Sequence, residues 1–188
     1  FVCGAAVQWL RDGLQLIKSS DEIEKLAQEV ETSEGVSFVP ALVGLGAPHW
    51  KPEARGVICG LHRGTKKSHI AYATLEAMAL QNVEILNGMQ KELGQKIKNV
   101  KVDGGASKNN LLMQMQSDFS GLRVVRPQNQ ETTVMGAAYL AGLGCGMWKD
   151  LSQIKSLWFI EKEFKSEKSK VWRTQRLMGW TKAVKKSF

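Results

Sequence analysis

The sequence contains few cysteines and histidines and no long apolar run. Its three cysteines, Cys3, Cys59 and Cys145, are far apart and lack the spacing of a disulfide framework or a zinc site. This pattern indicates a reducing compartment, and we expect the cytoplasm. No run of about 18 apolar residues occurs, which argues against a transmembrane helix. The apolar start has no basic region and is interrupted at Arg11 and Asp12, so we expect no signal peptide.

Common nucleotide-binding fingerprints and internal repeats are also missing. The 188 residues contain neither a Walker loop nor the Gly-x-Gly-x-x-Gly fingerprint of dinucleotide-binding proteins. A hydrophobic content of 43% is enough for one large domain, or for a domain and a tail. Because the first residue is Phe1 and the chain opens inside a helix-like pattern, we expect a fragment or a processed piece of a longer protein.

Positive charge is concentrated near the end of the chain. Residues 161–188 hold nine Lys or Arg and three Glu, so six of the eight net positive charges lie there. A basic tail suggests binding to nucleic acid or another anionic surface. The alternative is a solvated amphipathic helix, with an apolar face formed by Trp172, Met178, Trp180 and Val184. We favour the helix and expect no nucleic-acid partner, because no nucleic-acid motif accompanies the charge.

The stretch 99–114 predicts a strand, a glycine turn and a helix. Val100 and Val102 alternate with polar residues, as in a half-buried strand. The sequence Asp103-Gly104-Gly105 ends the strand, and Ser107 is a predicted N-cap for the helix that follows. Such a unit places backbone N–H groups and a positive helix end beside a space where a nucleotide could lie. The alternative is an ordinary α/β turn that binds nothing.

The rest of the chain predicts alternating helices and strands, which is typical of an α/β fold. The strands at 100–102 and 122–125 should be parallel neighbours. The helix at 134–143 is made of small residues, and we expect it to lie tightly against a sheet or another helix. Other helices are expected at 2–17, at 20–30 with Ser19 or Ser20 as cap, at 69–93 and within the tail, and other strands at 36–39 and 56–61.

Five small or polar residues stand out within the predicted helices and loops: Gly4, Gln8, His49, Glu76 and Gln81. Gly4 and Gln8 are one helical turn apart and share a face. The glycine permits close approach of a ligand or of another helix. We interpret His49 as structural, because no Cys, Asp or Glu stands nearby in the sequence to orient it. Glu76 and Gln81 lie among apolar neighbours, and we expect backbone groups to satisfy them.

Several motifs then occur together, in order and at consistent spacing. They are Phe38-Val39-Pro40-Ala41, Gly44-Leu45-Gly46-Ala47-Pro48, Gly56-x-x-x-Gly60-Leu61 followed after seven residues by His69-Ile70-x-x-Ala73-Thr74-Leu75-Glu76, Val102-Asp103-Gly104-Gly105, Gln114-x-Gln116-Ser117-Asp118, Glu131-Thr132-Thr133 and Gly136-Ala137-Ala138-Tyr139-Leu140-Ala141-Gly142. Across essentially its whole length the chain resembles the C-terminal half of FGGY carbohydrate kinases, within the actin-like ATPase superfamily. It is most similar to the members that act on glycerol.

The resemblance implies a fold, a reaction and a set of nucleotide contacts. The fold would be the RNase H-like (actin-like ATPase) α/β lobe over residues 1–160, lacking its first strands, with a basic helix at 161–188 packed on it. The reaction would transfer the γ-phosphoryl group of Mg-ATP to glycerol, giving glycerol 3-phosphate, with ATP and Mg²⁺ as cofactors. An intact protein would be a homo-oligomer that binds glycerol through its other lobe. The implied ATP contacts are Gly4, Val7, Gln8, Gly105 and Asn109.

The same resemblance implies that several functional groups of the family lie outside these 188 residues. The aspartate base, the phosphate-binding loops and the glycerol contacts of the family would precede Phe1. No catalytic residue and no metal ligand are therefore predicted here, and we expect the fragment alone to be inactive. Lys51 stands where the family usually has an acidic residue. An alternative function is a non-catalytic binding module derived from a carbohydrate kinase.

Overall fold

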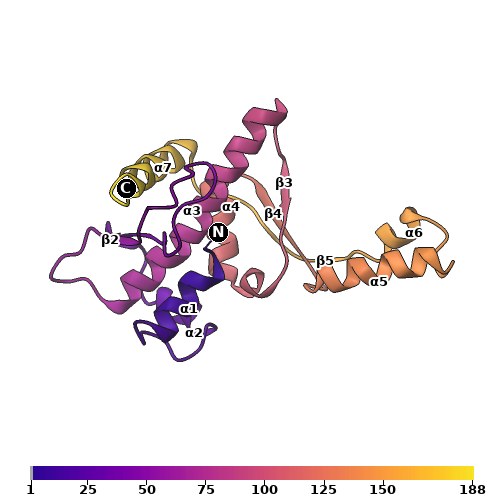
Figure 1. Ribbon diagram of the computed structural model, residues 1–188, viewed down its shortest axis with the longest axis horizontal. Coiled ribbons are helices and arrows are strands. Elements are labelled where there is room, and N and C mark those ends of the chain that lie inside the picture. The colour runs from indigo at the N-terminus through magenta and orange to yellow at the C-terminus, as the bar shows by residue number, and fades with distance from the viewer. Residues whose placement is uncertain (1) are drawn as a thin grey trace.

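The structure is a computed structural model that describes residues 2–188, and its helices and strands alternate as an α/β fold. It contains two small sheets, one long central helix and a projecting arm (Figure 1). The elements in chain order are α1 (Gly4–Asp12), α2 (Glu22–Ala27), β1 (Ser37–Val39), β2 (Val57–Cys59), α3 (Lys67–Leu93), β3 (Asn99–Lys101), the 3₁₀ helix η1 (Gly105–Lys108), α4 (Asn110–Ser120), β4 (Arg123–Pro127), α5 (Thr132–Gly144), α6 (Leu151–Ser156), β5 (Ile160–Phe164) and α7 (Lys170–Val184).

Helix α3 is the element around which the others pack. Its sequence of small and apolar residues buries side chains on several sides, including Leu75, Met78 and Val83. The helix ends at Gly94, which adopts the left-handed conformation with φ of 61°. Helices α2 and α4 pack against α3, and the hydrophobic core therefore lies between these three helices.

The larger sheet has the order β3-β4-β5. Strands β3 and β4 are parallel, with Val100 opposite Val124, so the predicted parallel pair is confirmed. Strand β5 pairs antiparallel with β4, and the sequence analysis missed it. Because Glu161, Lys162 and Glu163 are charged and exposed, this segment shows no apolar alternation that would indicate a strand. Strands β1 and β2 lie where the sequence predicted strands and pair antiparallel with each other.

The basic end of the chain forms helix α7, which packs on the body of the molecule. Trp180 and Val184 are buried, and Trp172 stacks on Phe119 of α4 with ring centroids 5.1 Å apart. The side chain of Ser169 caps this helix by accepting a hydrogen bond from the Trp172 N–H. The predicted apolar face is therefore confirmed for Trp172, Trp180 and Val184, but Met178 is 57% exposed and does not belong to it.

Two predicted helix boundaries are wrong. Helix α1 ends at Asp12 instead of continuing to residue 17, and the chain leaves the helical path at Gln15, where φ is 53°. Helix α2 begins after Asp21 and has no side-chain cap, so neither Ser19 nor Ser20 caps it. Ser107 is likewise not a helix cap, since it lies inside η1 and donates its hydroxyl hydrogen to the Gly104 carbonyl.

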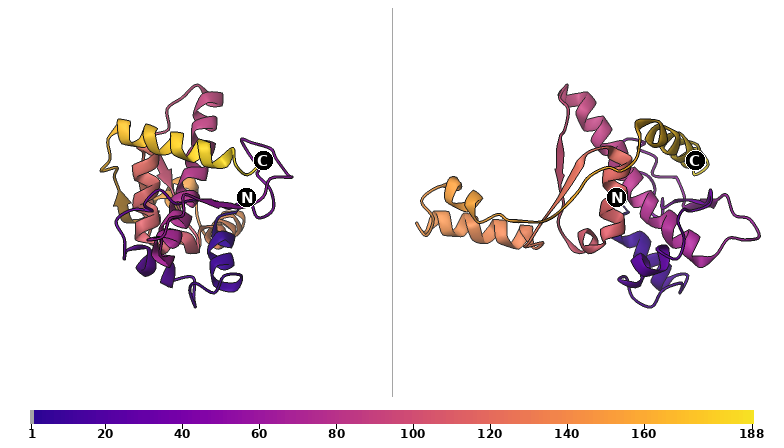
Figure 2. Two further views of the ribbon diagram at one scale, coloured as in Figure 1. Left: turned by 90° about the vertical axis from the view of Figure 1, so that its left-hand side faces the viewer. Right: turned by 180° about the vertical axis from the view of Figure 1, so that it is seen from behind.

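Helices α5 and α6 form an arm that extends away from the body (Figure 2). The prediction that α5 lies tightly against another element is wrong. Within residues 2–188 only Gly142 of this helix is buried, whereas Val134 is 66% and Leu140 is 69% exposed. Trp148 packs against Gly142, but the alanines Ala137, Ala138 and Ala141 are exposed. In the same described residues, no helix is both long and apolar enough to cross a membrane.

Candidate functional site

One cavity brings together all five residues that the sequence analysis named as nucleotide contacts. It has a volume of about 600 Å³ and lies between α1, α2, α3 and the η1–α4 turn. Gly4, Val7 and Gln8 line it from α1, while Gly105 and Asn109 line it from the turn. Residues roughly 100 positions apart in the chain thus share one cavity, which is large enough for a small-molecule ligand.

Apolar side chains form part of the cavity wall. Val7 is 6% exposed, and Ile23, Leu75, Met78 and Leu112 also line the cavity. These side chains belong to α1, α2, α3 and α4, so the wall is held by the hydrophobic core. Such a surface can bind the flat face of a purine base by burying apolar area.

The two glycines that line the cavity leave it open to a ligand. A Cβ atom added at Gly4 or at Gly105 would meet no other atom within 4 Å. At Gly4 the structure therefore favours space for a ligand over close packing of another helix. Gly104 is the residue of the turn with positive φ, 77°, and its N–H donates to the Gln130 carbonyl at 3.0 Å. The turn is thus shaped by Gly104, while Gly105 keeps the cavity open.

The N-terminus of α4 is already supplied with acceptors. Asn109 Oδ1 accepts from the Leu112 N–H at 2.8 Å, and the Asn109 carbonyl accepts from the Met113 N–H at 3.1 Å. The Leu111 N–H donates to Glu24 Oε1 at 2.9 Å. The Leu111 and Leu112 N–H groups are therefore not free for a bound anion, because protein oxygens already accept from them, although the turn does lie beside a cavity as expected.

Arg126 of β4 fixes the loop that carries the site. Its buried guanidinium donates to the Ser107 carbonyl at 2.6 Å and to the Lys108 carbonyl at 3.2 Å. It also donates to Asn110 Oδ1 and to both carboxylate oxygens of Glu161 in β5. The arginine holds the pKa of Glu161 below its ordinary value, mainly through this hydrogen bond. The loop is thus anchored to the sheet by charge-assisted hydrogen bonds.

Sequence reasoning missed Glu24 and Arg126. Glu24 is an acidic residue in the first turn of α2, a position that carries no information about its partner. Leu111, to which it bonds, is 87 residues away. Arg126 precedes a proline at the end of a strand, and nothing local predicts that its side chain turns back to the glycine loop.

The comparisons with known proteins agree with this geometry. The family model described as the C-terminal domain of the FGGY family of carbohydrate kinases matches residues 1–145. The chain belongs to the FGGY family. It is 63% identical to a glycerol kinase of Bdellovibrio bacteriovorus over 186 residues, which are 99% of this chain and 38% of the relative. The chain therefore spans about two fifths of the length of the relatives that it matches.

Solved structures of FGGY kinases share the fold. A crystal structure of Plasmodium falciparum glycerol kinase with ADP matches with a TM-score of 0.90 and 35% identity, over 98% of this chain and 37% of that one. A ligand-bound xylulose kinase of Lactobacillus acidophilus matches with a TM-score of 0.75 at 22% identity, over 98% of this chain and 36% of that one. The predicted fold, an α/β C-terminal FGGY kinase lobe of the actin-like type, is confirmed.

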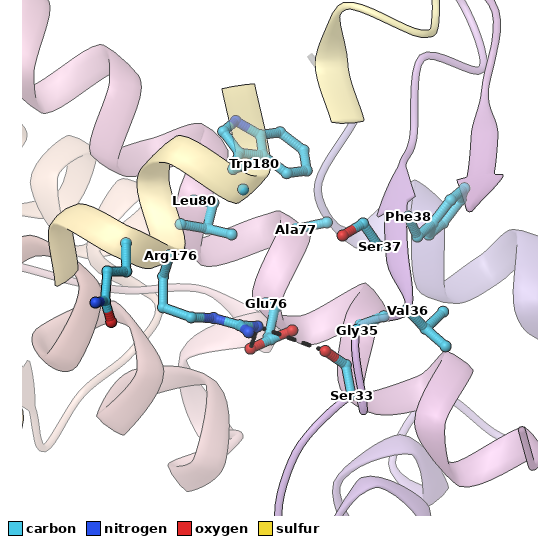
Figure 3. Close-up of a pocket in the computed structure, with 13 residues that line it drawn as sticks. Ser33, Gly35, Val36, Ser37, Phe38, Glu76, Ala77, Leu80, Arg176 and Trp180 are labelled. Atoms are coloured by element: carbon cyan, nitrogen blue, oxygen red, sulfur yellow. Dashed lines mark hydrogen bonds and ion pairs between the residues drawn. The ribbon is translucent and has the colours of Figure 1, made fainter. Parts of the chain in front are cut away.

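The FGGY signature residue Glu76 forms a buried ion pair. Its carboxylate contacts the Arg176 guanidinium of α7, which also donates to Ser33 Oγ at 3.4 Å, and this pair borders a second cavity of about 70 Å³ (Figure 3). Burial raises the pKa of Glu76, although Arg176 and Ser33 oppose the shift. Burial and the Glu76 charge also raise the pKa of Tyr72 to about 12. The expectation that backbone groups satisfy Glu76 is therefore wrong.

Two other polar residues also differ from expectation. His49 Nε2 lies 3.2 Å from both carboxylate oxygens of Glu84 in α3, so a carboxylate does orient this imidazole. Glu84 is 35 residues away in the chain, which hid the pair from local sequence analysis. The Nε2 atom of Gln81 is buried and has no hydrogen-bond partner among residues 2–188. In that same part of the chain no three His, Cys, Asp or Glu side chains gather to hold a metal.

Proposed function

We propose that the chain is the nucleotide-binding C-terminal lobe of a glycerol kinase. The intact enzyme would transfer the γ-phosphoryl group of Mg-ATP to a terminal hydroxyl of glycerol and release glycerol 3-phosphate. The observation that carries the proposal is that Gly4, Val7, Gln8, Gly105 and Asn109 line one cavity of about 600 Å³. The similarity to an ADP-bound glycerol kinase over 98% of the chain supports it.

The cavity suits the adenosine end of the nucleotide better than its phosphates. Apolar side chains such as Leu75 and Met78 offer a surface for the base, while Gln8 and the Nδ2 group of Asn109 offer hydrogen-bonding groups. The Leu111 and Leu112 N–H groups at the start of α4 donate to Glu24 and Asn109 and are not free for phosphate. The transferred phosphoryl group would therefore lie outside this cavity, towards the other lobe.

The remaining requirements of phosphoryl transfer would be met by the rest of an intact protein. The reaction needs positioned phosphates, a metal that neutralises charge and a base for the attacking hydroxyl. We assign none of these roles to a side chain of this lobe. Mg²⁺ would enter as part of the substrate Mg-ATP, and glycerol would bind to the other lobe. We further propose that the intact protein is a cytoplasmic homo-oligomer.

Calorimetric titration of the purified chain with ADP tests the nucleotide assignment. We expect saturable binding of one ADP per chain, because the cavity is formed by residues of this chain alone. Gly4→Val provides the matched variant, since Gly4 lines the cavity and a Cβ there would meet no other atom within 4 Å. Absence of ADP binding by the parent chain, or equal binding by Gly4→Val, would contradict the proposal.

A non-catalytic binding module derived from a carbohydrate kinase is the alternative. Its specific support is the exposed arm of α5 and α6, where Val134 and Leu140 are mostly exposed and could contact a partner. The two functions differ in nucleotide binding and in the activity of the longer protein. Glycerol-dependent ADP release by the full-length protein would support the kinase, and its absence would support the module.

A further inference from the structure

Glu24 has one carboxylate oxygen engaged with the protein and a second one available at the cavity. Its side chain is partly buried on α2 and lines the cavity. Oε1 accepts the hydrogen bond from the Leu111 N–H at 2.9 Å, which ties the carboxylate to the start of α4. Oε2 has no hydrogen-bond or ion-pair partner among residues 2–188. The carboxylate is therefore held in place while keeping a free acceptor.

The charge of Glu24 limits what this acceptor can bind. An ionised carboxylate accepts hydrogen bonds and donates none, so it needs a donor on the ligand. Asp21 of the same wall is a second carboxylate, so the two together disfavour a phosphate next to Glu24, while Lys108 is a cation that lines the same cavity. The Leu111 and Leu112 N–H groups of α4 already donate to protein oxygens. The ligand group at Glu24 should therefore be uncharged and should carry donors.

Two parts of an adenine nucleotide meet this description, the ribose hydroxyls and the 6-amino group of the base. The base has an apolar surface available at Val7, Ile23, Leu75 and Met78. Placing the base there leaves the sugar for the carboxylate. We propose that Glu24 binds a ribose hydroxyl and makes this site specific for ribonucleotides. This inference depends on the proposed nucleotide-binding function.

The test compares ADP with 2′-deoxy-ADP and 3′-deoxy-ADP by calorimetry on the parent chain and on Glu24→Gln. Glutamine keeps an oxygen for the Leu111 N–H, so the fold should survive, which thermal unfolding checks. In the parent chain, at least one of the two deoxy analogues should bind about tenfold more weakly than ADP, the effect of losing a hydrogen bond to a charged group. In Glu24→Gln the dissociation constant of that analogue divided by that of ADP should fall towards one.

Glu22 supplies the matched control on the same helix. It is an exposed glutamate whose Oε2 accepts from the Lys18 N–H at 2.9 Å, and it does not line the cavity. Glu22→Gln removes the same charge and keeps the same kind of backbone contact. It should preserve the preference of the parent chain for ADP over the deoxy analogue. A purely structural role of Glu24 would change stability without changing this preference.

The possible results distinguish failure of the proposed nucleotide-binding function from failure of the ribose inference. If the parent chain does not bind ADP, the proposed function fails. The ribose inference alone fails if the parent binds ADP and both deoxy analogues equally, or if Glu24→Gln keeps the parent ratio. It also fails if Glu22→Gln reduces the preference for ADP over the deoxy analogue as much as Glu24→Gln does. Inosine diphosphate, which lacks the 6-amino group, is a further probe. If the parent chain binds it more weakly than ADP and Glu24→Gln does not, the carboxylate contacts the base instead of the ribose.

Discussion

The side-chain oxygen of Asn109 lies 2.8 Å from the backbone nitrogen of Leu112 and caps helix α4. The same side chain lines the cavity, so one residue joins helix stability to the proposed nucleotide site. Because Oδ1 is committed to the cap, the Nδ2 group is the part of Asn109 that remains to contact a ligand. The two roles can be separated by choosing the substitution.

Asn109→Ala should therefore have two effects. Loss of the cap should lower the free energy of unfolding by about 1 kcal/mol. Loss of the amide donor should weaken nucleotide binding by roughly 1 kcal/mol, with little effect on the chemical step of an intact enzyme. Asn109→Ser keeps a capping oxygen, so it should restore stability and still bind nucleotide weakly. Urea unfolding and calorimetry measure the two effects. Parent-like ADP affinity in Asn109→Ser would show that Asn109 is a cap only.

Gly105→Val should block the cavity without disturbing the turn. The φ angle of Gly105 is not positive, and a Cβ there meets nothing within 4 Å, so bulk alone should reduce ADP affinity more than tenfold. Glycerol binding in an intact protein should survive, since it would use the other lobe. Gly104→Val is the control for strain: with φ at 77° it should cost about 1–2 kcal/mol of stability. The prediction is wrong if Gly105→Val binds ATP as well as the parent chain does.

Local patterns in the sequence predicted those parts of the fold that local patterns determine. The 27 residues of α3 and the parallel pairing of β3 with β4 follow from apolar periodicity and from the glycine turn between them. Residues such as Glu24 and Arg126 act through partners far along the chain, and no local period encodes such contacts. The five predicted nucleotide contacts lie at one cavity, and their binding to nucleotide stays a prediction. The division of the chain at residue 160 also stays a prediction.

The ion pair between Arg176 and Glu76 should make stability depend on pH. Burial raises the pKa of Glu76 above its ordinary 4.5, so the folded state holds this proton more tightly than the unfolded state. The corresponding stability is fully present below pH 4.5 and is lost as pH rises through the folded pKa. Arg176→Met removes the cation that opposes the shift, so the folded pKa should rise further. The variant should then be about 2 kcal/mol less stable than the parent at pH 7.5, with a smaller difference near pH 4.5.

Chemical unfolding at both pH values measures this dependence. Arg173→Met on the same helix is the control, because Arg173 donates to Ser166 Oγ and to the Lys168 carbonyl and to no carboxylate. Its effect on the free energy of unfolding should be the same at both pH values. An Arg176→Met effect that does not change between pH 4.5 and 7.5 would mean that Arg176 does not shift the pKa of Glu76.

The apolar arm of α5 and α6 should cause the isolated chain to self-associate. The arm exposes large apolar side chains among residues 2–188; those more than 60% exposed are Val134, Leu140, Met147 and Leu151. Contiguous exposed apolar surface is unusual for a soluble monomer. Strand β4 lies between β3 and β5, whereas β3 keeps one unpaired edge among residues 2–188. We expect a second copy to cover the arm, because the arm exposes the large apolar side chains.

Sedimentation of two variants tests this surface. Val134 and Val171 have nearly the same exposure, 66% and 67%, but Val134 lies on the arm and Val171 on α7. Val134→Glu should shift the chain towards monomer, whereas Val171→Glu should associate like the parent, because the added charge is then remote from the contact.

We also expect no glycerol phosphorylation by the isolated chain in any of these forms, since the catalytic groups are assigned to the rest of an intact enzyme. A parent chain that sediments as a monomer at every concentration, or that turns over glycerol by itself, would contradict these expectations.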